Sequence, residues 1–275
     1  MGSILSPQLL PSLILPDGGI RPPLKWAGGK RWLVSILREK WSKHSHRRLV
    51  EPFCGGLAVV LGLLPEKATL NDINPHVINF YNHLKKGLVI RSKQEYDSEF
   101  YYECREEFNS LIRDGKAESR RGAELFYYLN RTGYNGLCRF NQQGEYNVPF
   151  GSHSNIRYRK SFLHYKDALR NWEFSCGDFE NTDVNSNDLI YADPPYDVQF
   201  TKYSKEGFSW DDQIRLAKWL SLHKGPVILS NQATDRITNL YEELGFKLEY
   251  HNAPRHISCT GNRDKAREVV ATLRI

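Results

Sequence analysis

Short runs of apolar residues recur along the chain and alternate with stretches of helical periodicity. Such runs stand at residues 48–51, 68–70, 188–192 and 227–230, and an amphipathic stretch at 211–223 precedes the last of them. Buried strands that alternate with helices are typical of a parallel α/β sheet. Two later runs, 247–252 and 268–274, are more alternating or β-branched, and they predict an antiparallel pair at the edge of the sheet.

The middle of the chain has a different character, because it is rich in Tyr, Arg, Asn and Phe. We predict an inserted, mainly helical recognition domain at residues 88–159. Residues 21–87 and 160–275 then form the catalytic domain, and residues 1–20 form a flexible leader. Three prolines interrupt that leader, which has no basic start, so neither a secretory signal nor a membrane span is expected.

Composition narrows the functional classes only modestly. The five cysteines (Cys54, Cys104, Cys138, Cys176 and Cys259) are scattered and never form C-x-x-C, which argues against a disulfide framework and against a zinc site. We therefore expect a reducing, cytoplasmic setting. The formal net charge of +6 favours a nucleic-acid partner, although an ordinary basic enzyme remains compatible with it.

The first candidate site is Asp193-Pro194-Pro195-Tyr196, directly after the apolar run 188–192. Two prolines cannot continue a central strand, so the motif predicts a rigid loop at the carboxyl end of a strand, where open α/β sheets bind ligands. A carboxylate there can polarise an exocyclic amine for methyl transfer, and the neighbouring tyrosine offers a face on which an extruded base can stack. The alternative is a simple proline turn with a solvated aspartate.

The second candidate is Lys25-Trp26-Ala27-Gly28-Gly29-Lys30. Leu24 and Arg31 stand where a Walker A loop needs glycine and serine or threonine, so phosphate binding is disfavoured. The paired glycines, Lys30 and Trp26 instead suit a ligand that carries a carboxylate and a sulfonium. A chance Gly-Gly at a helix start is the alternative.

A glycine turn and an acidic residue form the third candidate. A predicted strand runs into Glu51-Pro52-Phe53-Cys54-Gly55-Gly56, which we expect to be followed by an apolar helix at 57–64. Such turns are usual contact points for nucleoside cofactors, and Asp72, after the next strand, suits a ribose hydroxyl. As an isolated feature, Asp72 could equally be a helix cap.

The fourth candidate spans residues 128–151 and interleaves basic, aromatic and asparagine side chains with glycines. This pattern suits phosphate contact, base-edge reading and wedging into a base stack. An exposed loop with structural tyrosines is the alternative.

Taken together and in this order, the motifs from about Leu24 onward resemble the Dam family of DNA adenine-N6 methyltransferases, in the α-group order. The specific part of the resemblance is Lys-Trp-Ala-Gly-Gly-Lys together with Asn-Arg-x-Gly-Tyr-Asn-Gly-Leu-Cys-Arg, ahead of Asp-Pro-Pro-Tyr. It implies a Rossmann-like methyltransferase sheet, S-adenosylmethionine as the cofactor, double-stranded DNA as the partner and GATC as the site. It also implies base flipping and direct methyl transfer to N6 without a metal ion. No obligate protein partner is expected.

The resemblance also assigns roles to individual residues. Asp193, Pro194, Pro195 and Tyr196 correspond to the catalytic loop, with Ser230-Asn231 beside the target-base pocket. The implied cofactor contacts are Trp26, Lys30, Phe53, Gly55, Asp72, Asp178, Phe179 and Asp193. The implied DNA contacts are Arg131, Tyr134, Asn135, Leu137, Arg139 and Pro149, in which Arg139 reads guanine and Tyr134 wedges into the duplex.

Two positions depart from the family pattern. Leu57 replaces the second glycine of Phe-x-Gly-x-Gly, and Ser152 stands where an arginine is frequent, so one duplex contact is either missing or supplied by Arg157 or Arg159. An RNA adenine methyltransferase and a DNA-binding module without turnover remain the alternative functions.

Overall fold

The computed structural model describes residues 14–152, 158–197, 207–253 and 266–275. The chain forms two compact units. Unit 1 comprises Met1–Arg31, Gly55–Leu64 and Asn74–Cys176, and unit 2 comprises Trp32–Cys54, Pro65–Ile73 and Gly177–Ile275. None of the helices within the described ranges is both long enough and apolar enough to cross a membrane.

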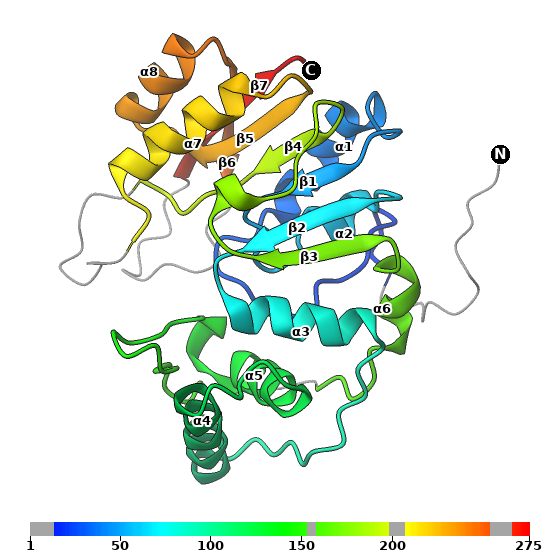
Figure 1. Cartoon of the computed structure of the whole chain (residues 1–275), viewed down its shortest axis with the longest axis vertical. Helices are drawn as coiled ribbons and strands as arrows, with labels where there is room; N and C mark the ends of the chain where they lie inside the picture. Colours follow the sequence, from blue (N-terminus) through cyan, green and yellow to red (C-terminus); the bar gives the residue numbers. More distant parts are fainter. Residues whose placement is uncertain (1–13, 153–157, 198–206, 254–265) are drawn as a thin grey trace. The chain divides into compact units, whose positions relative to one another are not determined.

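Unit 2 is built on a mixed β-sheet (Figure 1). Its strands are β1 (Leu49–Glu51), β2 (Ala68–Asp72), β4 (Leu189–Ala192), β5 (Val227–Gln232), β6 (Lys247–Ala253) and β7 (Ala266–Leu273). The first four run parallel in the order β2-β1-β4-β5, and β7 lies antiparallel between β5 and β6. With β3 (Trp172–Cys176) the full order is β3-β2-β1-β4-β5-β7-β6, which confirms the predicted α/β sheet with an antiparallel edge pair.

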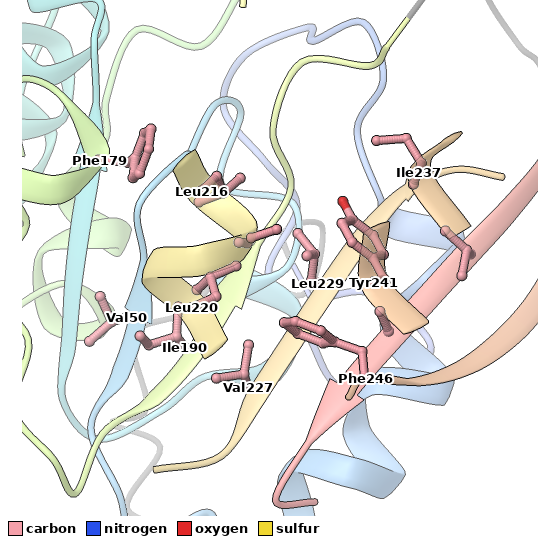
Figure 2. Close-up of a cluster of buried hydrophobic side chains, with 14 residues drawn as sticks. Val50, Phe179, Ile190, Leu216, Leu220, Val227, Leu229, Ile237, Tyr241 and Phe246 are labelled. Carbon is pink, nitrogen blue, oxygen red and sulfur yellow. The ribbon is translucent and has the colours of Figure 1, made fainter. Parts of the chain in front are cut away.

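The helices of unit 2 include α1 (Val34–Ser42), α7 (Trp210–Leu222) and α8 (Asp235–Glu243), with a short 3-10 turn, η4 (Phe179–Asn181). A capping box, in which Ser209 and Asp212 satisfy each other's backbone N–H groups, begins α7. Figure 2 shows the apolar side of α7 packed on the strands, where Leu216 and Leu220 meet Ile190 and Val227. This buried cluster holds β4 and β5 rigidly, and the loop that begins at Asp193 follows the carboxyl end of β4.

Unit 1 is mainly helical. It contains α2 (Val60–Leu63), α3 (Pro75–Lys85), α4 (Ser98–Arg113), α5 (Arg120–Thr132), η3 (Tyr134–Gly136) and α6 (Leu163–Ala168), and Figure 1 shows α3, α4 and α5 as neighbours. Side chains of Asn74, Asp97 and Ser119 cap the starts of α3, α4 and α5. Aromatic rings form the interior, for example Phe80 stacked on Tyr127 with 5.7 Å between centroids.

The helix expected at residues 57–64 is wrong in its extent. Leu57 has a φ of 59°, in the left-handed region, and only Val60–Leu63 form α2. Leu64 ends this helix with a φ of 53°. Leu57 is 0% exposed, so this part of the chain is apolar because it is buried and not because it is helical. The prediction failed because a hydrophobic pattern alone does not distinguish a buried turn from a buried helix.

Candidate active site

The Asp193-Pro194-Pro195-Tyr196 loop follows directly from β4. Oδ1 of Asp193 accepts a hydrogen bond of 2.9 Å from the hydroxyl of Ser230, a residue of β5 that is 0% exposed. The phenol of Tyr191 is 2.9 Å from the same hydroxyl. Because β4 and β5 are parallel, with Ala192 opposite Leu229, the buried hydroxyl lies beside the carboxylate and fixes its orientation.

A second layer of polar side chains supports the prolines of the loop. The amide of Gln213, on α7, donates a hydrogen bond of 2.8 Å to the carbonyl of Pro195. Asn231 in turn donates to Gln213 and to the hydroxyl of Tyr241, both at 3.0 Å. Gln213 is 1% exposed and was not predicted as a site residue. A polar residue on the apolar side of the helical stretch 211–223 was the signal that could have identified it.

The tyrosine end of the loop is anchored as well. The hydroxyl of Tyr196 donates a hydrogen bond to the carboxylate of Glu268, which lies on β7 and is 4% exposed. The next residue, Asp197, forms an ion pair with Arg236 of α8, whose guanidinium lies 4.6 Å from the centre of the Trp210 ring. The aromatic ring that was predicted to stack on a target base is thus fixed at its far end.

The carboxyl ends of β1 and β2 come together in the same unit. β1 and β2 pair in parallel, and the backbone N–H of Cys54 donates to the carbonyl of Asn71 at 2.8 Å. The buried side-chain amide of Asn71 donates to the carbonyls of Pro52, at 3.2 Å, and Gly177, at 2.8 Å. Asn71 therefore joins the loops that carry Phe53, Asp72 and Asp178, three of the predicted cofactor contacts.

Beside Asp72 the structure exposes a large apolar side chain that was not predicted as a site residue. Ile73 is 72% exposed, an unusual amount for isoleucine. An apolar surface next to a carboxylate suits a nucleoside, whose base is flat and whose ribose carries hydroxyl donors. The available signal was the isoleucine that directly follows a strand-ending acid.

Asp178 and Phe179 are held by Arg215 of α7. The guanidinium contacts both carboxylate oxygens of Asp178, at 2.9 and 2.8 Å, and lies 4.3 Å from the centre of the Phe179 ring. The hydrogen bonds from Arg215 hold the pKa of Asp178 below its usual value. The ring of Phe179 packs 5.6 Å from that of Phe53, so this pair contributes to the core of unit 2.

In unit 1, Trp26 packs against the glycine turn. A Cβ on Gly55 would lie 2.7 Å from Nε1 of Trp26, and one on Gly56 would lie 2.5 Å from its Cβ. Both contacts are too short for any residue but glycine, so this packing explains the glycine pair. Lys30 is 3% exposed and its ammonium donates to the carbonyl of Gly28 at 3.1 Å.

The predicted DNA contacts lie on or beside one hairpin, residues 133–151, which we call the recognition hairpin. Bridges between Gly133 and Phe150 and between Phe140 and Tyr146 hold its two sides together. Tyr134 is 50% exposed. Asn135, Arg139 and Pro149 are exposed too, whereas Leu137 and the preceding Arg131 are half-buried.

Arg139 is held in place by a neighbour across the hairpin. Its Nε donates to the side-chain oxygen of Asn147 at 2.7 Å, and its Nη2 donates to the carbonyl of the same residue at 3.0 Å. Nη1 takes no part in these two bonds. Arg157, one of the two predicted substitutes for the missing arginine, lies outside the described residues, and Arg159 lies within them.

Comparison with known proteins agrees with these features. The sequence profile of the D12 class N6 adenine-specific DNA methyltransferases matches residues 26–257. The type II methyltransferase M.MjaIII of Methanocaldococcus jannaschii is 35% identical, over 90% of this chain and 96% of its own. The retron Ec67 DNA adenine methylase of Escherichia coli is 34% identical, over 90% of both chains. A DNA adenine methylase of Vibrio cholerae is 36% identical, over 90% of this chain and 94% of its own.

These matches confirm the resemblance to the Dam family that the sequence motifs indicated. The Asp193-Pro194-Pro195-Tyr196 loop, the glycine turn and the recognition hairpin all fall within the matched residues. The chain belongs to the D12 class N6 adenine-specific DNA methyltransferases, enzymes that take the methyl group from S-adenosylmethionine.

Proposed function

We propose that this methyltransferase acts on the adenine of GATC in double-stranded DNA, after the base has left the helix. The proposal rests chiefly on the recognition hairpin, which presents Tyr134, Asn135, Arg139 and Pro149 at its surface. An aromatic wedge, an amide, a guanidinium and an apolar ring are the side-chain types that open a base stack and read base edges.

The residues of unit 2 fit the nucleoside part of S-adenosylmethionine. Asp72 offers a carboxylate for ribose hydroxyls, and the exposed Ile73 beside it offers an apolar surface for the adenine ring. Asn71 ties these positions to the loop of Phe53 through its bond to Pro52. The bound cofactor supplies an electrophilic methyl group on a positively charged sulfur.

Asp193 prepares the nucleophile. The adenine amine is a poor nucleophile because its lone pair is delocalised into the ring. A carboxylate that accepts a hydrogen bond from this amine favours the pyramidal form, whose lone pair can attack. Ser230 keeps Oδ1 of Asp193 oriented, and Glu268 holds the ring of Tyr196, on which the extruded base stacks.

Arg139 gives the hairpin its choice of sequence. An arginine that donates two hydrogen bonds to O6 and N7 of guanine contributes about 1–3 kcal/mol of discrimination against another base. The bonds that Arg139 donates to Asn147 fix the guanidinium before DNA arrives, so less side-chain entropy is lost on binding. Leu137 and Pro149 can contact the thymine methyl group, and Arg131 is assigned to a phosphate or to the flipped base.

The test is single-molecule sequencing of DNA from cells that lack other adenine methylation and express this chain. We expect N6-methyladenine at GATC with the wild type and none with Asp193→Ala, expressed to the same level. Methylation at another motif would overturn the GATC assignment. Methylation of an RNA oligonucleotide in preference to the DNA duplex of the same sequence would overturn the choice of substrate.

Base flipping has its own readout. A duplex with 2-aminopurine at the target position becomes more fluorescent when that base leaves the stack. We expect a rise with the wild type and a smaller one with Tyr134→Ala, because the wedge is lost. No rise with the wild type, at a protein concentration that saturates the duplex, would contradict flipping.

A further inference from the structure

Asn130, near the end of α5, forms a two-point bridge with the backbone of Lys25. Its Oδ1 accepts from the backbone N–H of Lys25 and its Nδ2 donates to the carbonyl of Lys25, both at 2.8 Å. Asn130 is 1% exposed, so neither bond competes with water. The bridge joins segments that are 105 residues apart in the sequence.

The two ends of the bridge lead to different ligands. Lys25 directly precedes Trp26 in the Trp26 segment, residues 25–30, which we assign to the cofactor. Asn130 directly precedes Arg131 and is followed by the recognition hairpin, which we assign to DNA. One buried amide therefore fixes both segments.

Two further contacts tighten the same junction. The ammonium of Lys25 donates to the carbonyl of Arg131 at 3.1 Å. A Cβ on Gly136 would lie 2.4 Å from Cβ of Lys25, so the backbone turn that carries Tyr134 and Asn135 rests directly on this lysine. A displacement of either segment must move the other.

We propose that the Asn130–Lys25 bridge couples cofactor binding to DNA recognition, so that each ligand raises the affinity of the enzyme for the other. The inference rests on the proposed function, since it takes the Trp26 segment and the recognition hairpin as the two binding elements. A ligand that orders one segment lowers the entropic cost of ordering the other, and the effect on affinity is equal in both directions.

The chain offers a matched control in Asn109. This buried asparagine of α4 makes the same kind of bridge, because its Nδ2 donates to the carbonyl of Tyr146 at 3.1 Å and its Oδ1 accepts from the N–H of Tyr146 at 2.8 Å. It joins α4 to the returning side of the hairpin and not to the Trp26 segment. Asn109→Ala thus removes an equivalent bridge while the Lys25 junction stays intact.

The experiment measures linkage with the full-length protein. The dissociation constant of S-adenosylhomocysteine, which cannot react, is measured by calorimetry without DNA and with a saturating GATC duplex. The ratio of the two constants is the coupling factor. We expect at least about fivefold for the wild type and for Asn109→Ala, and a factor near one for Asn130→Ala.

Asn130→Asp provides a second variant should the alanine variant fail to fold. It keeps an acceptor for the N–H of Lys25 but loses the donor to its carbonyl, so we expect the coupling factor to fall here too. Circular dichroism and thermal melting verify that each variant is folded before it is titrated.

Several results would overturn the coupling. These are a wild-type factor of one when both ligands bind, a wild-type factor retained in the Asn130 variants, and an equal loss in Asn109→Ala. Failure of the proposed function looks different, because the wild type would then not methylate the GATC duplex, and that result overturns the coupling as well. A merely structural role for Asn130 would lower stability and leave the ratio unchanged.

Discussion

The hydroxyl of Ser230 donates a 2.9 Å hydrogen bond to Oδ1 of Asp193, from a residue that is itself completely buried. A hydrogen bond to a charged acceptor contributes about 1.5–3 kcal/mol. We expect Ser230→Ala to lower kcat by about 10- to 100-fold, because the carboxylate loses the partner that orients it.

Ser221→Ala is the control for this prediction, since Ser221 is a half-buried serine of α7 whose hydroxyl bonds the carbonyl of Lys218, at a solvent-exposed position. The measurement is single-turnover methylation at saturating cofactor, with the cofactor dissociation constant determined in parallel. An unchanged rate, or a loss explained entirely by weaker cofactor binding, would remove Ser230 from this role.

Glu268 is expected to act through Tyr196. Glu268→Gln keeps an oxygen that can accept from the phenol, so we expect it to retain most activity, whereas Glu268→Ala removes this acceptor of the Tyr196 hydroxyl. The 2-aminopurine signal should change in Glu268→Ala together with kcat, because stacking of the extruded base depends on the ring position. Tyr196→Phe should make the additional Glu268→Ala change nearly silent, and additive effects of the two changes would contradict the coupling of these residues.

Arg139 and Asn147 give a graded prediction about specificity. Arg139→Ala should remove the preference for guanine at the position it reads, about 1–3 kcal/mol or roughly 5- to 150-fold. Asn147→Ala leaves the guanidinium present but unoriented, and we expect a smaller loss of the same preference. The measurement compares methylation rates on GATC with those on duplexes substituted at each guanine-bearing position. If Arg139→Ala keeps the wild-type ratio at all of them, the residue contacts only phosphate.

The architecture could be predicted well from the sequence, because helices and strands follow the local periodicity of apolar residues. The parallel strands, the antiparallel edge pair and the helix before β5 all appear within a few residues of the predicted bounds. The sequence also predicted that the Asp193 loop would follow a buried strand, because proline ends a central strand and this signal is present in the local sequence.

The residues that support the site were beyond the reach of this reasoning. Glu268, Asn71 and Asn130 are buried polar residues whose partners lie far away in the sequence, 106 residues away for the bond from Asn71 to Gly177. Their roles depend on which strands and helices become neighbours, and no local pattern carries that information. The wrongly predicted helix start at Leu57 has a related cause. The side chain of Leu57 is buried in the core although its backbone is not helical, and the local sequence pattern records only the burial.

Leu57 allows two opposing effects to be weighed. Its left-handed backbone costs about 1–2 kcal/mol, which glycine would relieve. Its side chain is fully buried, and removal of such a leucine costs about 2.7–5 kcal/mol. Burial outweighs strain, so we expect Leu57→Gly to destabilise the protein by about 1–4 kcal/mol although glycine matches the family pattern.

Leu64→Gly is a matched comparison for Leu57→Gly. Leu64 has a similar φ of 53° but is only half-buried. The free energy of unfolding of the Leu64→Gly variant should stay within about 1 kcal/mol of the wild-type value, because the relief of backbone strain offsets the smaller loss of buried surface. Equal destabilisation of the two variants in urea titrations would refute the dominance of burial at Leu57.

His76 predicts how stability depends on pH. Its ring lies among Phe108, Phe126 and Phe140, with centroid distances of 5.0, 6.4 and 5.1 Å. Burial lowers the pKa of His76 from 6.5 to about 4, so the folded protein keeps the ring neutral over a range in which the unfolded chain is protonated. Stability from this residue is therefore complete above pH 6.5 and falls as the pH decreases toward 4. Because the ring is partly exposed, we expect a loss of about 1–3 kcal/mol across that interval.

His76→Leu isolates this contribution, because leucine is apolar and of similar volume and cannot be protonated. Carboxylates titrate in both proteins, so the informative quantity is the difference between their free energies of unfolding at pH 7.5 and at pH 4.5. We expect the wild type to lose more stability than the variant over this range, and most of the extra loss should fall between pH 6.5 and 4.5, where only the unfolded histidine takes up a proton. Parallel curves for the two proteins would show that His76 is protonated equally in both states, and the apolar packing of its ring would then carry no pH dependence.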